Sequence, residues 1–176
     1  DGTLTACRVF IELARAKGKV YFDSIQVEKS AGARYYNLVE NSDFSNTPAV
    51  TNGGNASGAT AYSWTTDNIQ SGDGVYTVGG RNYVLMSGSP DKRKQIKQII
   101  PINASSGDTM IIGGRAGAYA TDGDNDGRCF NIIVEFYSAD NSCFETLTID
   151  FDRSVNQSHQ TKASVFNHPK NPLHFH

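Results

Sequence analysis

Apolar and polar residues alternate in short runs along most of this chain, and this period of two is typical of β-strands with one buried face. Between residues 4 and 13, Cys7, Val9, Ile11 and Leu13 alternate with mostly polar or small residues. Clusters of Gly, Asn, Asp and Ser separate the runs and indicate turns. The predicted strands are residues 4–13, 20–27, 62–65, 75–78, 83–86, 95–102, 109–120, 130–137, 144–151 and 162–166, and residues 35–45 are predicted as a short strand running into a polar turn.

About nine to eleven strands and no convincing helix predict an all-β fold, a two-sheet antiparallel β-sandwich of the jelly-roll type. A length of 176 residues suits one domain. We expect residues 4–13 and 20–27 to form a hairpin that turns at residues 17–19, and a second hairpin to turn at residues 139–142. Residues 92–97, spelled KRKQIK, also suit a helix, but we favour an edge strand protected by its lysines.

The charge balance argues against a polyanionic partner. Lys and Arg number 16 against 18 Asp and Glu, and the formal net charge is −2. No positive field would therefore attract nucleic acid or an anionic membrane surface. No apolar run approaches the roughly 20 residues that cross a bilayer, so we expect no membrane insertion.

The three cysteines are too few for a disulfide framework, and buried free thiols are the main interpretation. The alternative is a bridge between Cys129 and Cys143. If the second hairpin turns as predicted, these two residues lie at different heights along it, and this separation argues against the bond.

Residues 19–28, KVYFDSIQVE, resemble the closing strand of galactose-binding-like jelly-roll modules, which have an aromatic pair, an acidic residue and an alternating apolar ending. Residues 37–44, NLVENSDF, resemble the opening strand of the same modules, and the likeness continues through residues 97–102, 107–109 and 113–116. A closing strand thus precedes an opening strand. The resemblance implies a tandem array, as in the repeated carbohydrate-binding-like domains of bacterial wall-associated proteins with Rhs or YD repeats.

This order divides the chain into three expected parts. Residues 1–30 would be the closing β-hairpin of a module, from a preceding repeat or permuted, residues 31–166 a jelly-roll carbohydrate-binding-like module, and residues 167–176 an irregular tail. We expect the hairpin to pack into the sheet formed by residues 35–166, because unpaired strands would leave backbone groups exposed along an edge. The packing would occur within one chain or by exchange in a strand-swapped dimer.

Proteins of this type bind sugars by stacking aromatic rings against pyranose faces, while Asn, Gln, Asp and Arg groups bond the hydroxyls. One departure is Arg115, which stands where the family often has a tryptophan. An aromatic residue in a strand is also a candidate for the core, and for Trp64 in particular buried packing is the alternative. The candidate ligand-binding residues are Trp64, Tyr62, Tyr76, Tyr83, Tyr119 and Arg115.

Two sets of acidic residues are candidates for a structural calcium ion. Residues 122–127, DGDNDG, copy the first half of a calcium loop with Asp122, Asp124 and Asp126. The second half does not match, because Ile133 stands where an EF-hand has its bidentate glutamate, and an acidic turn is the alternative. The resemblance implies a separate site between the opening turn and the closing strand, at Asp23, Glu40 and Asp43.

Catalytic residues are not predicted. No pair of carboxylates stands out as a glycosidase would require, and all four histidines follow residue 158, mostly in an unpatterned tail. We therefore expect no enzyme, but an extracellular or bacterial cell-surface, non-catalytic carbohydrate-binding module. It would tether a larger protein to polysaccharide or cell-wall glycan, beside neighbouring modules. The alternatives are a structural spacer without a sugar site and, less in keeping with the sequence, a glycosidase fragment.

Overall fold

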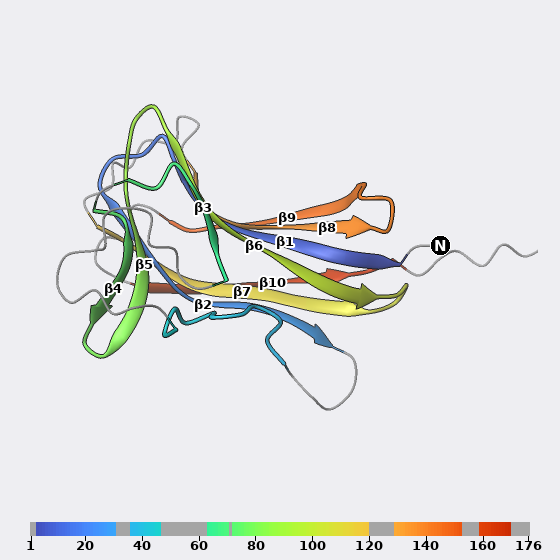
Figure 1. The fold of residues 1–176 in the computed structure, drawn as a ribbon. Helices are drawn as coiled ribbons and strands as arrows, with labels where there is room; N and C mark the ends of the chain where they lie inside the picture. The colour runs from blue at the N-terminus through green and yellow to red at the C-terminus, as the bar shows by residue number, and fades with distance from the viewer. Residues whose placement is uncertain are drawn as a thin grey trace, which may run out of the picture.

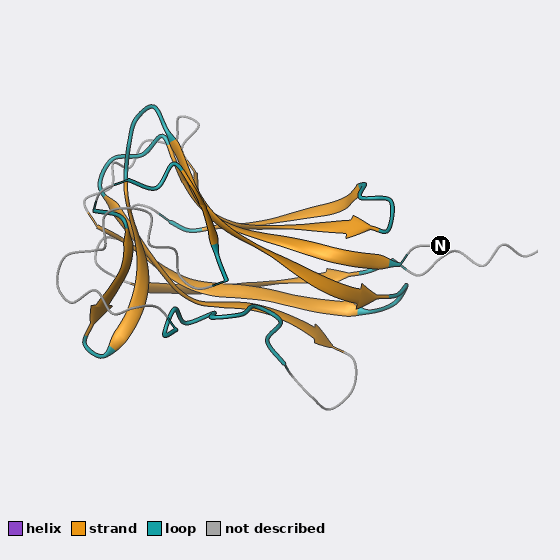
Figure 2. Ribbon diagram, viewed as in Figure 1, coloured by secondary structure: helices purple, strands orange, loops and turns teal. Residues whose placement is uncertain are grey.

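The chain forms a β-sandwich of two antiparallel five-stranded sheets (Figure 1). The computed structural model describes residues 3–30, 36–46, 63–70, 72–119, 129–152 and 159–169. These residues contain ten strands and no helix (Figure 2). The prediction of a two-sheet, all-β sandwich is confirmed.

The two sheets lie face to face as separate layers in Figure 1. In spatial order, the first sheet consists of β3 (Thr65–Asp67), β6 (Arg93–Ala104), β1 (Leu4–Ala14), β8 (Cys129–Ser138) and β9 (Cys143–Asp150). The second sheet consists of β10 (His159–Asn167), β7 (Thr109–Tyr119), β2 (Lys19–Ser30), β5 (Arg81–Ser87) and β4 (Gly74–Val78).

The predicted N-terminal hairpin is wrong, because β1 and β2 do not pair with each other. β1 lies between β6 and β8 in the first sheet, and β2 lies between β7 and β5 in the second. Residues 15–18 connect the two strands, and a connection of this length easily crosses the separation of about 10 Å between packed sheets. The first thirty residues thus supply the central strand of each sheet within one chain.

The core lies between the sheets and follows the alternation of the strands. Cys7, Val9, Ile11 and Leu13 of β1 are buried on its inner face, opposite inward-facing residues of β2. Aromatic rings fill the space between the layers; Phe22 meets Phe130 edge to face at a centroid distance of 5.2 Å.

β2 changes its alternation at a bulge between Asp23 and Gln26, where Ser24 has a φ of 55°. Before the bulge Val20 and Phe22 face the core, and after it Ile25 and Val27 do. Strict alternation predicts Tyr21, Asp23, Ile25 and Val27 on one face, and the bulge makes this prediction wrong beyond Asp23. The extra residue leaves both Asp23 and Ser24 on the outside of the sandwich.

Two other predicted strands differ in detail. Residues 36–46 form no strand; Asn37 makes one isolated bridge to Glu28, and turns follow. Residues 93–97 belong to β6, so a strand rather than a helix is confirmed. They are not the edge of the sheet, because β3 pairs with residues 95–97. One of their lysines, Lys94, points inward.

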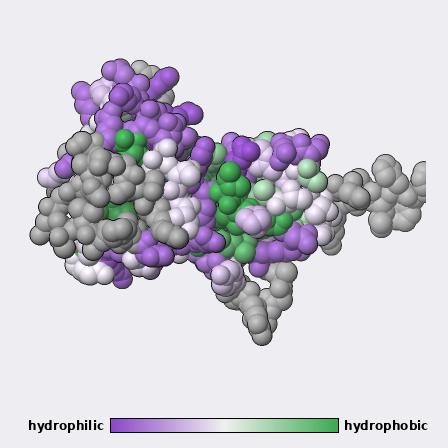
Figure 3. Space-filling model, in the orientation of Figure 1, coloured by the Kyte–Doolittle hydropathy of each residue, from purple (hydrophilic) through white to green (hydrophobic). Residues whose placement is uncertain are grey.

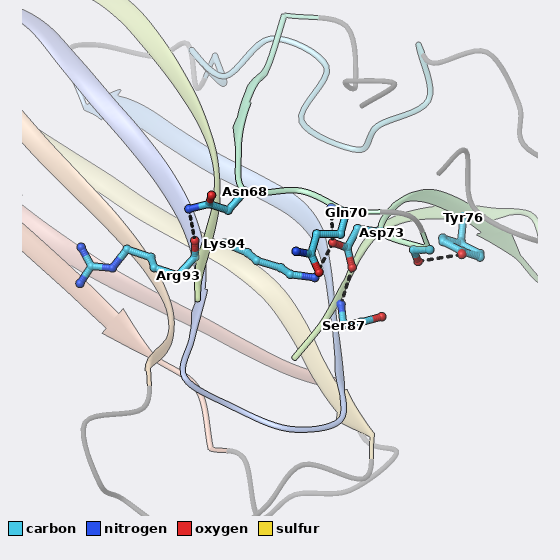
Figure 4. A network of polar contacts seen from close by, with 8 residues as sticks. Asn68, Gln70, Asp73, Tyr76, Ser87, Arg93 and Lys94 are labelled. Atoms are coloured by element: carbon cyan, nitrogen blue, oxygen red, sulfur yellow. Dashed lines mark hydrogen bonds and ion pairs between the residues drawn. The ribbon is translucent and has the colours of Figure 1, made fainter. Parts of the chain in front are cut away.

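A buried ion pair ties the two sheets together (Figure 4). The Lys94 ammonium of β6 lies 2.6 Å from the Asp73 carboxylate, and the two residues are 2% and 0% exposed. The same carboxylate accepts hydrogen bonds from the backbone N–H groups of Gln70 at 2.8 Å and Ser87 at 2.7 Å. Since Ser87 ends β5 of the second sheet, Asp73 joins both layers at this edge of the sandwich.

Candidate functional site

The outer surface of the second sheet gathers aromatic side chains from all five of its strands. In β4, β5 and β7, Val75, Val84 and Ala118 face the core, so the residues next to them face outward. Cross-strand pairing aligns the outward positions, with Tyr76 opposite Tyr83. We call this surface the tyrosine face. Its residues are Tyr21, Tyr76, Tyr83, Tyr119 and His159, together with Asp23 and Arg115.

The rings of the tyrosine face support one another. Tyr83 stacks on His159 at a centroid distance of 5.3 Å and meets Tyr21 edge to face at 6.4 Å. Burial raises the pKa of the Tyr21 hydroxyl, with smaller contributions from Tyr119 and Tyr76. Tyr83 is nearly covered, whereas Tyr119 is 47% exposed. Tyr83 thus forms a support, and Tyr119 offers a ring surface to a ligand.

A glycine lies between two of these ring-bearing positions. Gly117 of β7 lies between Tyr21 of β2 and His159 of β10 in the cross-strand pairing. Because Gly117 has no side chain, the backbone itself forms the floor between its two neighbours. Gly117 is buried, so neighbouring groups fill the space that its missing side chain leaves, and the position is not open to a ligand.

Charged groups lie beside the rings. Asp23 is opposite Arg115 in the pairing of β2 and β7, and the carboxylate and guanidinium are 4.0 Å apart. Burial and the positive charge of Arg115 lower the pKa of His159, while Asp23 acts in the opposite direction. At neutral pH His159 is therefore an uncharged ring that can both donate and accept a hydrogen bond.

A polar pocket of about 300 Å³ adjoins the tyrosine face at Asp23. The bulge at Ser24 forms one wall, and the turn that contains Asp43 and Ser45 forms another. Hydrogen bonds from the hydroxyl and backbone N–H of Ser45 lower the pKa of Asp43, which is ionised at neutral pH. The remaining lining residues are Gly80, Arg81 and Asn82.

The structure brings four of the predicted ligand-binding residues together, namely Tyr76, Tyr83, Tyr119 and Arg115. Trp64 is not among them. It is 3% exposed, its ring lies 5.6 Å from that of Phe44, and its indole N–H donates to the Asn41 carbonyl at 3.3 Å. The alternative of buried packing describes Trp64, so its ring has no face for a sugar. Tyr62 lies outside the described residues.

The predicted calcium ligands separate into different places. Asp23 and Asp43 line the same polar pocket, but Glu40 lines another pocket, beside Ser63. Across the described part of the chain, no three His, Cys, Asp or Glu residues are grouped to hold a metal ion. The three resemblance-implied ligands thus do not form one site in this arrangement, and Arg115 beside Asp23 opposes a cation there. Asp122, Asp124 and Asp126 lie outside the described residues.

Sequence reasoning missed two residues of the tyrosine face. Tyr21 shares the outward alternation of Asp23 before the bulge, and this signal was available in the sequence. His159 was set aside with the other histidines as a non-catalytic residue, and it begins β10. Just beyond β10, His168 is buried and held by a hydrogen bond from its backbone N–H to the Asp108 carbonyl.

The three cysteines are free, as expected, but only Cys7 is buried; Cys129 is partly buried and Cys143 is exposed, so the prediction of buried thiols is wrong for Cys143. Cys129 pairs with Ala14 at one end of β8, whereas Cys143 pairs near Tyr137 at the other end, so a bridge between them is excluded by distance. Within the described ranges, no helix is long and apolar enough to cross a membrane. No family model, curated protein or solved structure matches the chain.

Proposed function

We propose that the tyrosine face binds a polysaccharide, and that the protein is a non-catalytic carbohydrate-binding module. The observation that carries this proposal is the alignment of outward-facing rings from five neighbouring strands. Five strands at about 4.8 Å spacing extend over roughly 19 Å. A surface of this length suits a chain of several linked sugars, which would lie across the strands.

The chemistry of the face fits the mixed surface of a sugar. Tyr119 and Tyr21 offer apolar ring surfaces for the C–H faces of pyranoses, and the tyrosine hydroxyls are hydrogen-bonding groups at the ring edges. Arg115 supplies donors, and Asp23 supplies acceptors for sugar hydroxyls. The polar pocket next to Asp23 could take a terminal or branching unit of the glycan.

By binding the polysaccharide, this module would tether a larger protein that contains several such modules. We propose an extracellular or bacterial cell-surface location with plant or cell-wall glycan as partner. Because the rings are partly supported by one another, little side-chain entropy is lost on binding. An open face nevertheless buries limited area, so we expect weak affinity that tandem modules would increase through avidity.

A glycan array followed by affinity electrophoresis in polysaccharide gels tests the proposal, with and without calcium. Tyr119→Ala should weaken binding about two- to tenfold, in line with the ring's share of a stacking interaction. Val165→Ala is the matched control, because Val165 is an exposed residue of β10 on the same sheet but away from the rings. Retention of no glycan, or binding that Tyr119→Ala and Arg115→Met both leave unchanged, would favour a structural spacer instead.

A further inference from the structure

A second pocket lies beside β6 of the first sheet, apart from the tyrosine face. Its volume is about 340 Å³, and it is formed where the segment after residue 35 passes the edge of β6. Tyr36 and Ile99 line it and are 74% and 60% exposed. Figure 3 shows apolar surface over this part of the molecule. Leu38 and Pro101 extend the apolar walls.

The polar side of this pocket is held in place by a buried glutamine. The Gln98 carboxamide accepts a hydrogen bond from the Glu40 N–H at 2.8 Å and donates to the Glu40 carbonyl at 3.0 Å and the Ser63 carbonyl at 3.3 Å. Gln98 is itself 5% exposed. The Ser63 hydroxyl then donates to Oε2 of Glu40 at 2.7 Å. The backbone and one carboxylate oxygen of Glu40 are therefore fixed before any ligand arrives.

Glu40 is the one charged residue among the described residues that line the pocket. Its second carboxylate oxygen, Oε1, accepts no hydrogen bond from the described part of the chain. This carboxylate oxygen lies between apolar walls and beside an exposed tyrosine ring. Such a site suits a ligand that carries a cationic group on a partly apolar framework. The tyrosine ring adds attraction through its electron-rich face.

We propose that this pocket is a second glycan site that binds the protonated amine of an amino sugar. The amine would donate to Oε1 of Glu40, and the sugar ring would lie against Tyr36 and Ile99. The choice of a sugar as the body that carries the amine rests on the proposed function. The amine requirement rests on the pocket alone.

Titration calorimetry at pH 6 with a β-linked glucosamine tetramer and its fully N-acetylated counterpart tests this inference. Acetylation removes the positive charge and leaves the sugar chain in place. The unacetylated tetramer should bind about three- to tenfold more tightly, the range expected for an exposed charge pair with one aromatic contact. Its affinity should fall as salt is added, because an exposed pair is screened.

Glu40→Gln should abolish the preference for the free amine, since it removes the charge and keeps the shape. Asp67→Asn is the matched control: Asp67 is an exposed acid of β3 that does not line the pocket, and its loss should leave the preference unchanged. Tyr36→Ala should weaken binding of the unacetylated tetramer. Equal melting temperatures would show that the variants are folded.

Tyr119→Ala separates this inference from the proposed function. If it abolishes all glycan binding while Glu40→Gln changes nothing, the second site is refuted and the tyrosine face stands. If Glu40→Gln alone removes the preference, the second site stands whether or not the tyrosine face binds. Oligolysine is a further arm, because Glu40-dependent binding of that peptide without binding of glucosamine would identify a peptide site and overturn the inference.

Discussion

Replacing Lys94 by methionine removes the ammonium that neutralises the buried Asp73 carboxylate and keeps a side chain of similar length. Asp73 would retain its two backbone donors, from Gln70 and Ser87, but its negative charge would remain fully buried without a counterion. A carboxylate in this state is costly, because water can no longer solvate it. We therefore expect Lys94→Met to destabilise the sandwich strongly.

The magnitude follows from the contacts that remain. Removal of one partner of a buried pair costs about 3–5 kcal/mol, and the two backbone donors favour the lower end, about 3 kcal/mol. For a domain of this size, each kcal/mol lowers the melting temperature by about 2–4 °C. Lys94→Met should accordingly melt about 6–12 °C below the parent protein. The loss is large against a typical total stability of about 5–15 kcal/mol.

Urea denaturation followed by tryptophan fluorescence measures this change well, because the single tryptophan, Trp64, is buried in the core. Lys97→Met is the matched control: Lys97 is an exposed lysine of the same strand, and its loss should change stability by less than about 0.5 kcal/mol. Asp73→Asn and the double variant complete a mutant cycle. A loss below about 1 kcal/mol for Lys94→Met, or one no larger than that of Lys97→Met, would refute the reasoning.

Three other measurements test the fold and the tyrosine face. Burial and Arg115 lower the pKa of His159, so protonation of His159 opposes folding as the pH falls below the ordinary histidine range. An NMR titration of His159 should find a midpoint below the ordinary histidine pKa, and Arg115→Met should raise that midpoint. A further decrease in the Arg115→Met variant would contradict the geometry. Deletion of residues 1–30 removes the central strand of both sheets, so circular dichroism should detect no cooperative melting, and a monomer with an unchanged melting temperature would be the contrary result. Burial raises the pKa of Cys7 to about 12, whereas Cys143 is exposed. Alkylation at pH 8 followed by peptide mass spectrometry should therefore label Cys143 in the native protein and Cys7 only after denaturation. Early labelling of Cys7 would mean that the core opens readily.

Local signals in the sequence were sufficient for most strands and for one turn. The hairpin of β8 and β9 turns within the predicted residues 139–142, with Asn141 at a φ of 63°. Hydrogen bonds from Ser142 and Ser138 lower the pKa of the Asp140 carboxyl to about 2. All of these contacts span four residues or fewer, so the information that specifies them is contained in a few neighbouring letters.

Which strands pair with one another in each sheet was not predictable from such local signals. The alternation in β1 and β2 marks each as a strand with a buried face, but it does not say whether the two share a sheet or face each other across the core. Gly18, with a φ of 82°, suits a hairpin turn and a crossing connection equally. The burial of Trp64 also depends on distant residues, since the indole packs on Phe44 and bonds to Asn41.

The candidate site depends on the one place where β2 departs from regular alternation. Without the bulge, Ser24 and Gln26 would face the core, and Ile25 and Val27 would face water, so the apolar burial of the second half of the strand requires the extra residue. The same extra residue leaves Asp23 and Ser24 together on the outside, where they form the wall between the tyrosine face and the polar pocket. The sequence signals the bulge as a break in the apolar alternation, because the next inward-facing apolar residue after Phe22 is Ile25. An interpretation based on strict alternation misses this break. The strained backbone of Ser24 is thus explained by both faces of the strand. On the inner face the bulge keeps the core closed, and on the outer face it places polar groups where the tyrosine face meets the polar pocket.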